Sequence, residues 1–266
     1  MLSPQNSVKN VICSDALSGR KALVGGASKG LGQAIAHALA SAGAGVHGLS
    51  RDETTLSAAM QNLPGSGHRA TAVDFDQSVE LGNLVGDECY DILIHNTGGP
   101  AAGPLFEADP DDLDTAFRRH VRSAHVLMQQ VLPGMRAQGF GRIVLVVSTS
   151  VITPIQGLGV SNTIRNAIAN WARTLAVELA GDGITVNCLL PGFTDTDRLT
   201  SLIEGRANRQ DCTPEQVRDA MIASVPAGRL GHPGELAALA TFLCSEAAGY
   251  VNGTTIPVDG GRVVAG

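Results

Sequence analysis

Residues 21–43 read KALVGGASKGLGQAIAHALASAG, and this stretch decides the fold class. A short aliphatic run leads into a glycine-rich turn, after which apolar residues recur at helical spacing up to Gly43. The order predicts a buried strand, a tight turn and a helix. A turn of this kind between a strand and a helix is the first half of a parallel β-α-β unit.

The same alternation continues along the rest of the chain. Further strands are expected at residues 46–50, 71–75, 91–96, 142–148, 184–190 and 255–260. Helices are expected from residue 52, from residue 77, and at 111–138, 157–180, 195–223 and 233–245. Strands that are apolar throughout are buried on both faces, and right-handed crossovers then place helices on both sides of a parallel sheet. The pattern therefore predicts an α/β protein with a doubly wound, parallel, seven-stranded sheet.

Length and composition limit the classes of protein and partner. The chain has 266 residues, 44% of them hydrophobic and 17% charged, which predicts one globular domain and excludes a disordered chain. We expect this domain to cover residues 17–266, after an N-terminal extension at 1–16. The net charge of −6, with basic residues scattered along the chain, argues against nucleic-acid binding and favours a small-molecule partner.

Targeting and metal-binding signals are not found in the sequence. No run reaches the ~18 apolar residues of a membrane span, and the first residues do not form a signal peptide, so we expect a cytoplasmic protein without a membrane partner. The five cysteines lack a C-x-x-C pair, and buried free thiols are expected. The histidines lack ligand spacing, so no metal site is predicted.

The glycine-rich turn predicts a phosphate-binding site. Its three glycines allow backbone amides to approach a pyrophosphate, and the helix that follows directs unpaired N–H groups and the positive end of its dipole at the anion. A ligand-free tight connection is the alternative. The predicted phosphate-binding residues are Gly26, Ser28, Lys29, Gly30, Leu31 and Gly32.

Residues after the second and third strands indicate which dinucleotide binds. Ser50 and Arg51 stand where the adenosine ribose should lie, and a guanidinium there suits a 2′-phosphate, which favours NADP(H) over NAD(H). The alternative is that the basic side chains of Lys29 and Arg51 are simply exposed to solvent and bind no phosphate. Asp74 is placed to accept a hydrogen bond from the adenine amino group, with Phe75 beside it, or else caps a helix start.

Together these segments resemble the short-chain dehydrogenase/reductase family from Leu17 to Gly261. The family's Thr-Gly-x-x-x-Gly-x-Gly turn is matched except that Gly25 replaces the threonine, and its Asn-Asn-Ala-Gly stretch resembles residues 95–98, His-Asn-Thr-Gly. The family's nicotinamide-contacting Pro-Gly segment resembles residues 191–196. The resemblance assigns to the cofactor Asn96, Gly98, Pro191, Gly192, Thr194 and Thr196.

The tail from Pro226 to Gly261 is similar to that of β-ketoacyl carrier-protein reductases. The resemblance implies a Rossmann fold, NADP(H) as cofactor and a homotetramer. It also implies a carbonyl reductase similar to 3-oxoacyl reductases, acting on a small-molecule or acyl-thioester substrate.

The resemblance breaks down at the catalytic residues. The family's Tyr-x-x-x-Lys falls on Ser161 and Arg165, its catalytic serine on Ser148, and its helix asparagine on His120. A serine hydroxyl is a poor acid, but Ser161 can donate a hydrogen bond beside Ser148, and Arg165 can hold the nicotinamide ribose as the lysine does. The proton then comes from water or from His120, for which a packed helix histidine is the alternative that we favour.

Residues from about 194 to 225 are expected to form a lid over the substrate. Arg206 and Arg209 in this segment can meet an acidic substrate or a carrier's phosphopantetheine, but solvated surface charge is the preferred interpretation. Three functions stay open. The first is an NADP(H)-dependent oxidoreductase with an atypical site, and the second is an NADP(H)-binding protein without turnover and with a regulatory or structural role. The third is a non-redox enzyme such as a lyase or isomerase.

Overall fold

A computed structural model describes residues 15–77, 81–82, 84–86 and 88–265, and its centre is one seven-stranded sheet. The strand order is β3-β2-β1-β4-β5-β6-β7, and every neighbouring pair is parallel. The strands are β1 Lys21–Gly25, β2 Gly45–Ser50, β3 Arg69–Ala72, β4 Ile92–His95, β5 Gly141–Val146, β6 Ile184–Pro191 and β7 Thr255–Val258. The predicted doubly wound parallel sheet is confirmed.

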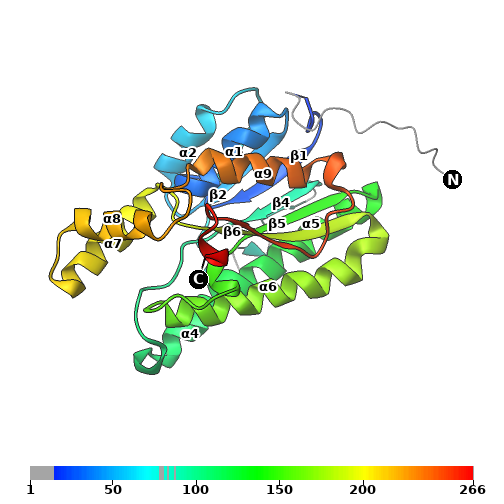
Figure 1. Cartoon of the computed structure of the whole chain (residues 1–266). Helices are drawn as coiled ribbons and strands as arrows, with labels where there is room; N and C mark the ends of the chain where they lie inside the picture. Colours follow the sequence, from blue (N-terminus) through cyan, green and yellow to red (C-terminus); the bar gives the residue numbers. More distant parts are fainter. Residues whose placement is uncertain (1–14, 78–80, 83, 87, 266) are drawn as a thin grey trace.

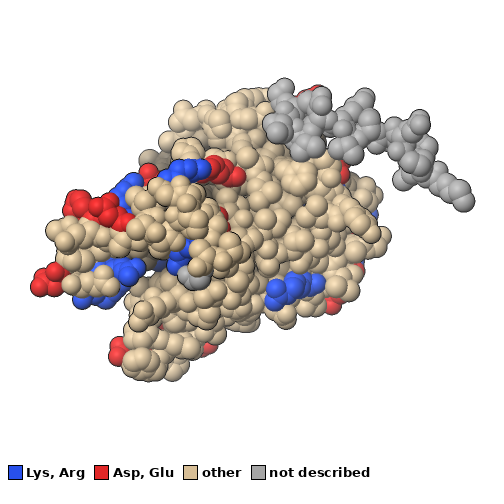
Figure 2. Space-filling view, viewed as in Figure 1, with Lys and Arg blue, Asp and Glu red and all other residues tan. Residues whose placement is uncertain are grey.

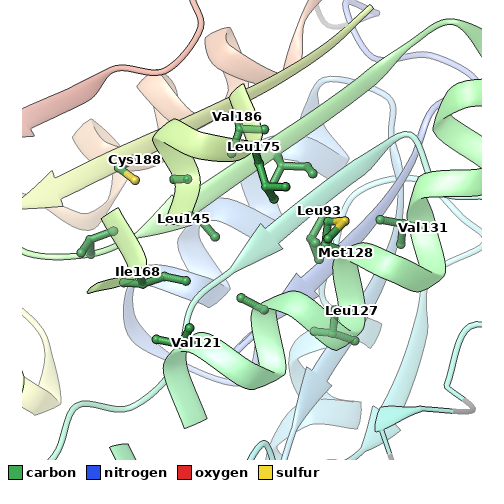
Figure 3. Close-up of a cluster of buried hydrophobic side chains, with 14 of the residues drawn as sticks. Leu93, Val121, Leu127, Met128, Val131, Leu145, Ile168, Leu175, Val186 and Cys188 are labelled. Atoms are coloured by element: carbon green, nitrogen blue, oxygen red, sulfur yellow. The ribbon is translucent and has the colours of Figure 1, made fainter. Parts of the chain in front are cut away.

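Helices cover both faces of this sheet (Figure 1). One face carries α1 Gly30–Ser41, α2 Glu53–Gln61 and α9 Pro233–Cys244, and the other carries α4 Pro110–Phe117, α5 Ser123–Gln138 and α6 Gly159–Leu179. Successive strand residues enter opposite cores, because strand side chains alternate between the two faces. In β4, Ile92 and Ile94 pack towards α1 and α9, whereas Leu93 packs with Leu127 and Met128 of α5 (Figure 3).

Two of the expected helices are interrupted. The helix expected at 111–138 is α4 and α5 joined by a π-helical turn, Arg118–Arg122. The helix expected at 195–223 is two helices, α7 Asp197–Gln210 and α8 Pro214–Ala223, since Asp211 is left-handed (φ 51°) and Pro214 begins a new helix capped by Thr213. The helix expected from residue 77 falls partly on residues 78–80, which lie outside the described residues.

Helices α7 and α8 project from the body of the molecule (Figure 1). They pack on each other through a small apolar cluster of their own, separate from the two cores of the sheet. Its buried members are Leu199, Ile203, Ala207, Val217 and Met221. A pair of helices with its own small core can shift as a unit against the domain, which suits the predicted lid.

The cysteines differ in burial. Cys188 and Cys244 are buried, and burial raises the pKa of each thiol to about 12. Cys89 is exposed, so the expectation of burial is wrong for this residue, and Cys13 lies outside the described residues. In the part of the chain that the structure covers, no helix combines the length and apolar character needed to cross a membrane.

Candidate functional site

A cleft of about 840 Å³ opens at the carboxyl ends of the strands, below α7 and α8. The segments that line it follow β1, β2, β3, β4, β5 and β6 in turn. The strand order reverses between β1 and β4, and ligands of doubly wound sheets bind at such a switch point. The cleft is therefore the candidate active site.

The turn after β1 forms a cradle of exposed backbone. A Cβ at Gly32 would lie 2.1 Å from the Gly26 carbonyl oxygen, and a Cβ at Gly26 would lie 2.7 Å from Asn96, so only glycine allows this packing. Gly30 has a positive φ of 59°, and its nearest neighbour outside the turn is the Thr196 side chain, 3.7 Å from an added Cβ. The backbone of this turn is therefore accessible from the cleft.

Helix α1 begins in this cradle without a side-chain cap. Its N-cap residue, Lys29, makes no capping hydrogen bond, and its first turn contains no acidic residue. The first N–H groups of a helix lack partners within the helix, and the dipole adds positive potential there. This uncapped start lined by Lys29, Gly30 and Leu31 fits a phosphate group.

The residues expected to contact the adenosine half lie at one end of the cleft. Ser50 donates a hydrogen bond to the Ser28 hydroxyl at 2.9 Å, which ties the end of β2 to the cradle, and Arg51 lines the cleft next to it. Phe75 also lines the cleft. Asp74 accepts a hydrogen bond from the backbone N–H of Asp76 at 3.1 Å and is not among the lining residues.

The residues expected to contact the nicotinamide half also line the cleft. Asn96 and Gly98 follow β4, and the Asn96 amide donates to the Gly25 carbonyl at 3.4 Å. From the end of β6, the cleft is lined by Pro191, Gly192, Thr194 and Thr196. Thr196 caps α7 by accepting the N–H of Leu199.

Two serine hydroxyls face the cleft near the end of β5. Ser148 accepts the backbone N–H of Ser150 at 3.1 Å, which leaves its own proton free to donate into the cleft. Ser161 stands one turn before Arg165 on α6, and residues four apart share a helix face. Ser148, Ser161 and Arg165 all line the cleft.

Arg165 is a buried cation. Its side chain is held by a 2.8 Å hydrogen bond from Nη1 to the Val146 carbonyl, only 9% of the residue is exposed, and Nε has no partner in the described structure. Burial, followed by the charge of Arg198, lowers the pKa of Arg165 to about 10. The group therefore stays charged near neutral pH, although burial of an unpaired charge is unfavourable.

His120 lies behind the wall of the cleft, in the π-helical turn. It is 2% exposed, its Nδ1 is 2.6 Å from the Thr97 hydroxyl, and its Nε2 lacks a partner among described groups. Burial, then the charge of Arg165, lowers the pKa of His120 well below 6.5, so the ring is neutral at neutral pH. Thr97 lines the cleft, whereas His120 does not.

The arginines of α7 are exposed, as expected, but they also line the cleft. Arg198, Arg206 and Arg209 all border it, and Arg262 of the tail joins them. Figure 2 shows Lys and Arg side chains on the projecting helices and at the hollow beside them, while most of the remaining visible face is uncharged. Sequence reasoning missed Arg262 because only the fold brings the tail here, and it missed Thr97 although this residue stands inside the 95–98 motif.

Neither tyrosine of the chain lines the cleft. Tyr90 is buried before β4 and donates a hydrogen bond to Glu88, and Tyr250 is fully exposed in the tail. The site therefore has no phenol to act as an acid. Its hydroxyls are those of serine and threonine, which donate hydrogen bonds but do not ionise near neutral pH.

Comparisons with known proteins agree with this geometry. A family model described as enoyl-(acyl carrier protein) reductase matches residues 26–262. A tropinone reductase homologue of Arabidopsis thaliana is 32% identical over 94% of this chain and 92% of its own length. A 3-oxoacyl-[acyl-carrier-protein] reductase of Vibrio harveyi is 32% identical over 92% of this chain and 98% of its own.

A solved structure shares the fold. L-Sorbose reductase of Gluconobacter frateurii, in complex with NADPH and L-sorbose, superimposes with a TM-score of 0.87 at 27% identity. The match covers 94% of this chain and 99% of that one. The likeness therefore extends over nearly the whole chain.

Proposed function

Because the chain belongs to the short-chain dehydrogenase/reductase family, we propose that it is an NADP(H)-dependent oxidoreductase that interconverts a carbonyl and an alcohol. The observation that carries the proposal is the uncapped start of α1 in a glycine cradle at the switch point of the sheet. The relatives include a 3-oxoacyl reductase, and a structural neighbour binds NADPH. A cytoplasmic location is part of this proposal.

The cofactor assignment rests on the charges at the two ends of the cradle. Lys29 and the α1 N-terminus would hold the pyrophosphate, and Arg51 with Ser50 would hold the 2′-phosphate of NADP(H). Arg165 would hold the nicotinamide ribose. Thr194 and Thr196 would contact the carboxamide from the end of β6.

The reaction would use hydroxyl donors and a fixed cation. The chemistry that bound NADPH would supply here is the transfer of a hydride to the carbonyl carbon. Ser148 and Ser161 donate hydrogen bonds to the carbonyl oxygen, and Arg165 stabilises the negative charge that develops there. We assign the proton to water, and we assign the neutral, buried His120 to positioning Thr97 through their hydrogen bond.

A specific observation also favours the second candidate, an NADP(H)-binding protein with little or no turnover. No described tyrosine reaches the cleft, so the acid that the resemblance assigns to catalysis is replaced by Ser161. The cradle and the ribose-side residues do not depend on that acid. Cofactor binding would therefore survive better than catalysis.

The two candidates are separated by one experiment. NADPH binding is measured by calorimetry, and NADPH oxidation is followed at 340 nm with a panel of ketones, 3-oxoacyl thioesters and quinones. The first candidate predicts oxidation that Ser161→Ala and Arg165→Ala each lower by at least tenfold. Tight NADPH binding without oxidation of any substrate supports the second candidate, and absence of NADPH binding contradicts both.

We further propose that the chain forms a homotetramer. Large apolar side chains are exposed on α6 and in the tail. On α6, Val177 is 82% exposed; in the tail, Val264 is 89% exposed and Tyr250 is fully exposed. Exposed apolar residues at separate elements are expected where copies of a chain pack together. The assembly would bury these side chains outside the cleft.

A further inference from the structure

The cleft is strongly basic in an acidic protein. The chain has a net charge of −6, yet the cleft is lined by seven basic residues and one acidic residue, Asp197. The basic residues are Lys29, Arg51, Arg165, Arg198, Arg206, Arg209 and Arg262. None of the seven forms an ion pair with a carboxylate in the described part of the chain. The cleft therefore concentrates positive charge that the protein does not neutralise.

Two of these arginines approach one point. A Cβ on Gly99 would lie 3.7 Å from Nη2 of Arg165 and equally 3.7 Å from Nη2 of Arg198. Two guanidinium groups that flank one residue repel each other; burial lowers the pKa of Arg165, and the charge of Arg198 lowers it further. Both lie within reach of a single small anion, which would relieve the repulsion and pair with the planar donors.

The buried arginine supplies the second, independent observation. Arg165 is more than nine-tenths buried, and its Nε has no partner among the described groups. Among these groups, the one hydrogen bond of its side chain goes from Nη1 to the Val146 carbonyl. A buried charge is retained where something pairs with it. Its surroundings in the chain offer a neutral carbonyl and another cation, so the charge of Arg165 is not neutralised and favours an anion nearby.

The position of the pair favours substrate over the cofactor's own phosphates. Lys29 and the start of α1 already provide for a pyrophosphate on the β1 side, and Arg51 lies at the β2 side. Arg165 lies one turn after Ser161 on α6, beside the hydroxyls assigned to the reacting carbonyl. Arg198 reaches this region from α7, where its Nη2 donates to the Pro100 carbonyl at 3.1 Å.

Apolar side chains also line the cleft. Ile155 and Leu158 line the cleft after β5, and Leu202 and Met221 line it from the lid. A ligand that fits both the arginine pair and these apolar side chains carries one anionic group and an apolar body. A carboxylate suits the guanidinium geometry because its two oxygens accept paired N–H donors.

We propose that the substrate is an oxo acid or hydroxy acid with an apolar body, whose carboxylate is bound by Arg198 next to Gly99, in the positive field of Arg165. This inference rests on the proposed oxidoreductase function, since it names the substrate class of the same cleft. Arg206 and Arg209, further along the same face of α7, add to the attraction for anions.

The test is a binding measurement that does not require turnover. Protein saturated with NADP⁺ is titrated by calorimetry with 4-phenylbutanoate and with 4-phenylbutanamide, a neutral compound of the same shape. We expect the acid to bind at least tenfold more tightly than the amide, with a preference that weakens as NaCl is added. In Arg198→Gln the preference should fall about tenfold, and Arg198→Lys should retain part of it.

A matched control is available on the lid itself. Arg218 on α8 pairs with Asp195 outside the cleft lining, so Arg218→Gln removes a lid charge and should keep the preference of the wild type for the acid. A role of Arg198 in holding the lid through Pro100 would weaken acid and amide equally. The acid-to-amide ratio therefore separates anion recognition from a structural role.

Two results would overturn the proposal. The first is equal affinity of the wild type for acid and amide, or no measurable binding of the acid. The second is an unchanged acid-to-amide ratio in Arg198→Gln. If this variant also loses NADP⁺ affinity, the arginine is assigned to the dinucleotide. Failure of the proposed function is distinct, because it shows as absence of NADP⁺ binding or of ketone reduction while acid binding is still measured.

Discussion

Gly32 packs directly on the backbone of Gly26, so that a Cβ at position 32 would lie 2.1 Å from the Gly26 carbonyl oxygen. This contact holds the first turn of α1 against the loop after β1. The geometry of the cradle therefore depends on two glycines that are six residues apart. Their replacement offers a direct test of the cradle.

We expect a graded loss across the cradle. Gly32→Ala must displace backbone, so it should lower the melting temperature and abolish measurable NADP⁺ binding. Gly30→Ala meets no close atom and suffers only its positive φ, at a cost of about 1–2 kcal/mol. Thermal melts and NADP⁺ titration check that Gly32→Ala loses more stability and more affinity than Gly30→Ala. Gly181→Ala, at a site with no atom within 4 Å and away from the cleft, is the control, and equal losses in all three variants would contradict the cradle.

The preference for the phosphorylated cofactor is predicted to depend on Arg51. Arg51→Ala should raise the Kd for NADP⁺ by about tenfold to a hundredfold, because a charge-assisted hydrogen bond is lost, and should leave the Kd for NAD⁺ nearly unchanged. Calorimetry with both dinucleotides gives the comparison. Arg118→Ala, in the π-helical turn after α4 and outside the cleft lining, should change neither value. A parallel change for both dinucleotides would refute the assignment of Arg51.

The sheet and the cradle were predictable because their signals are local. The apolar run 21–25 and the glycines after it specify a buried strand and a close approach of backbone within one short stretch. The break between α7 and α8 also has a local signal, Thr213 followed by Pro214. It was not predicted, because apolar residues continue at helical spacing on either side of it.

The cleft's charge was not predictable in the same way. Arg198, Arg206 and Arg209 have the spacing of a solvated helix face, and only the fold places α7 beside the cleft so that they border it. His120 is a second case: the sequence left open a proton relay or a packed helix histidine, and its position in the chain does not show that Thr97 stands between the ring and the cleft. Both depend on tertiary packing that residue spacing does not encode.

Acid should destabilise the protein through its buried histidines. Burial, followed by the charge of Arg69, lowers the pKa of His47 to about 4, and burial, followed by Arg165, lowers the pKa of His95 to about 3. In the unfolded chain a histidine titrates near 6.5, so below this pH the unfolded state binds protons first. Stability is therefore full above about pH 6.5 and falls towards pH 4, by about 1.4 kcal/mol per pH unit for each histidine.

Urea midpoints between pH 7.5 and 4.5 measure this slope. His47→Gln removes one of the protons taken up on unfolding, so its stability should depend less steeply on pH than that of the wild type. His37→Gln, at an exposed position on α1, should keep the slope of the wild type. If the His47 variant loses stability with pH as steeply as the wild type, its burial does not drive acid unfolding.

The proposed tetramer is predicted to depend on the exposed face of α6. Val177 is 82% exposed there, and Val177→Arg would place a charge in a contact between copies, which is unfavourable without a partner. We expect a smaller species by light scattering, with the circular dichroism of the fold retained. Lys29→Ala, at the cleft, should leave the assembly intact. A tetramer that persists in the Val177 variant would place the interface elsewhere.

Restoring the family's acid tests whether the frame of the site is sound. Ser161→Tyr together with Arg165→Lys would place a phenol one turn from an ammonium on the same face of α6, and a nearby cation lowers a phenol's pKa from about 10. We expect the double variant to reduce a generic neutral ketone at least tenfold faster than the wild type, measured as NADPH oxidation.

The two single variants identify the cause of any gain. Ser161→Tyr alone supplies the acid and keeps the buried cation, whereas Arg165→Lys alone exchanges the five-donor guanidinium that bonds to Val146 for a single ammonium. If the missing acid is what limits turnover, the gain should require the tyrosine and be largest in the double variant. If Arg165 and Arg198 instead shape the cleft for an acid, the double variant should lose affinity for 4-phenylbutanoate as it gains neutral ketone reduction. A double variant that binds NADPH normally and gains no activity would show that the cleft is built for a reaction in which a phenol has no place.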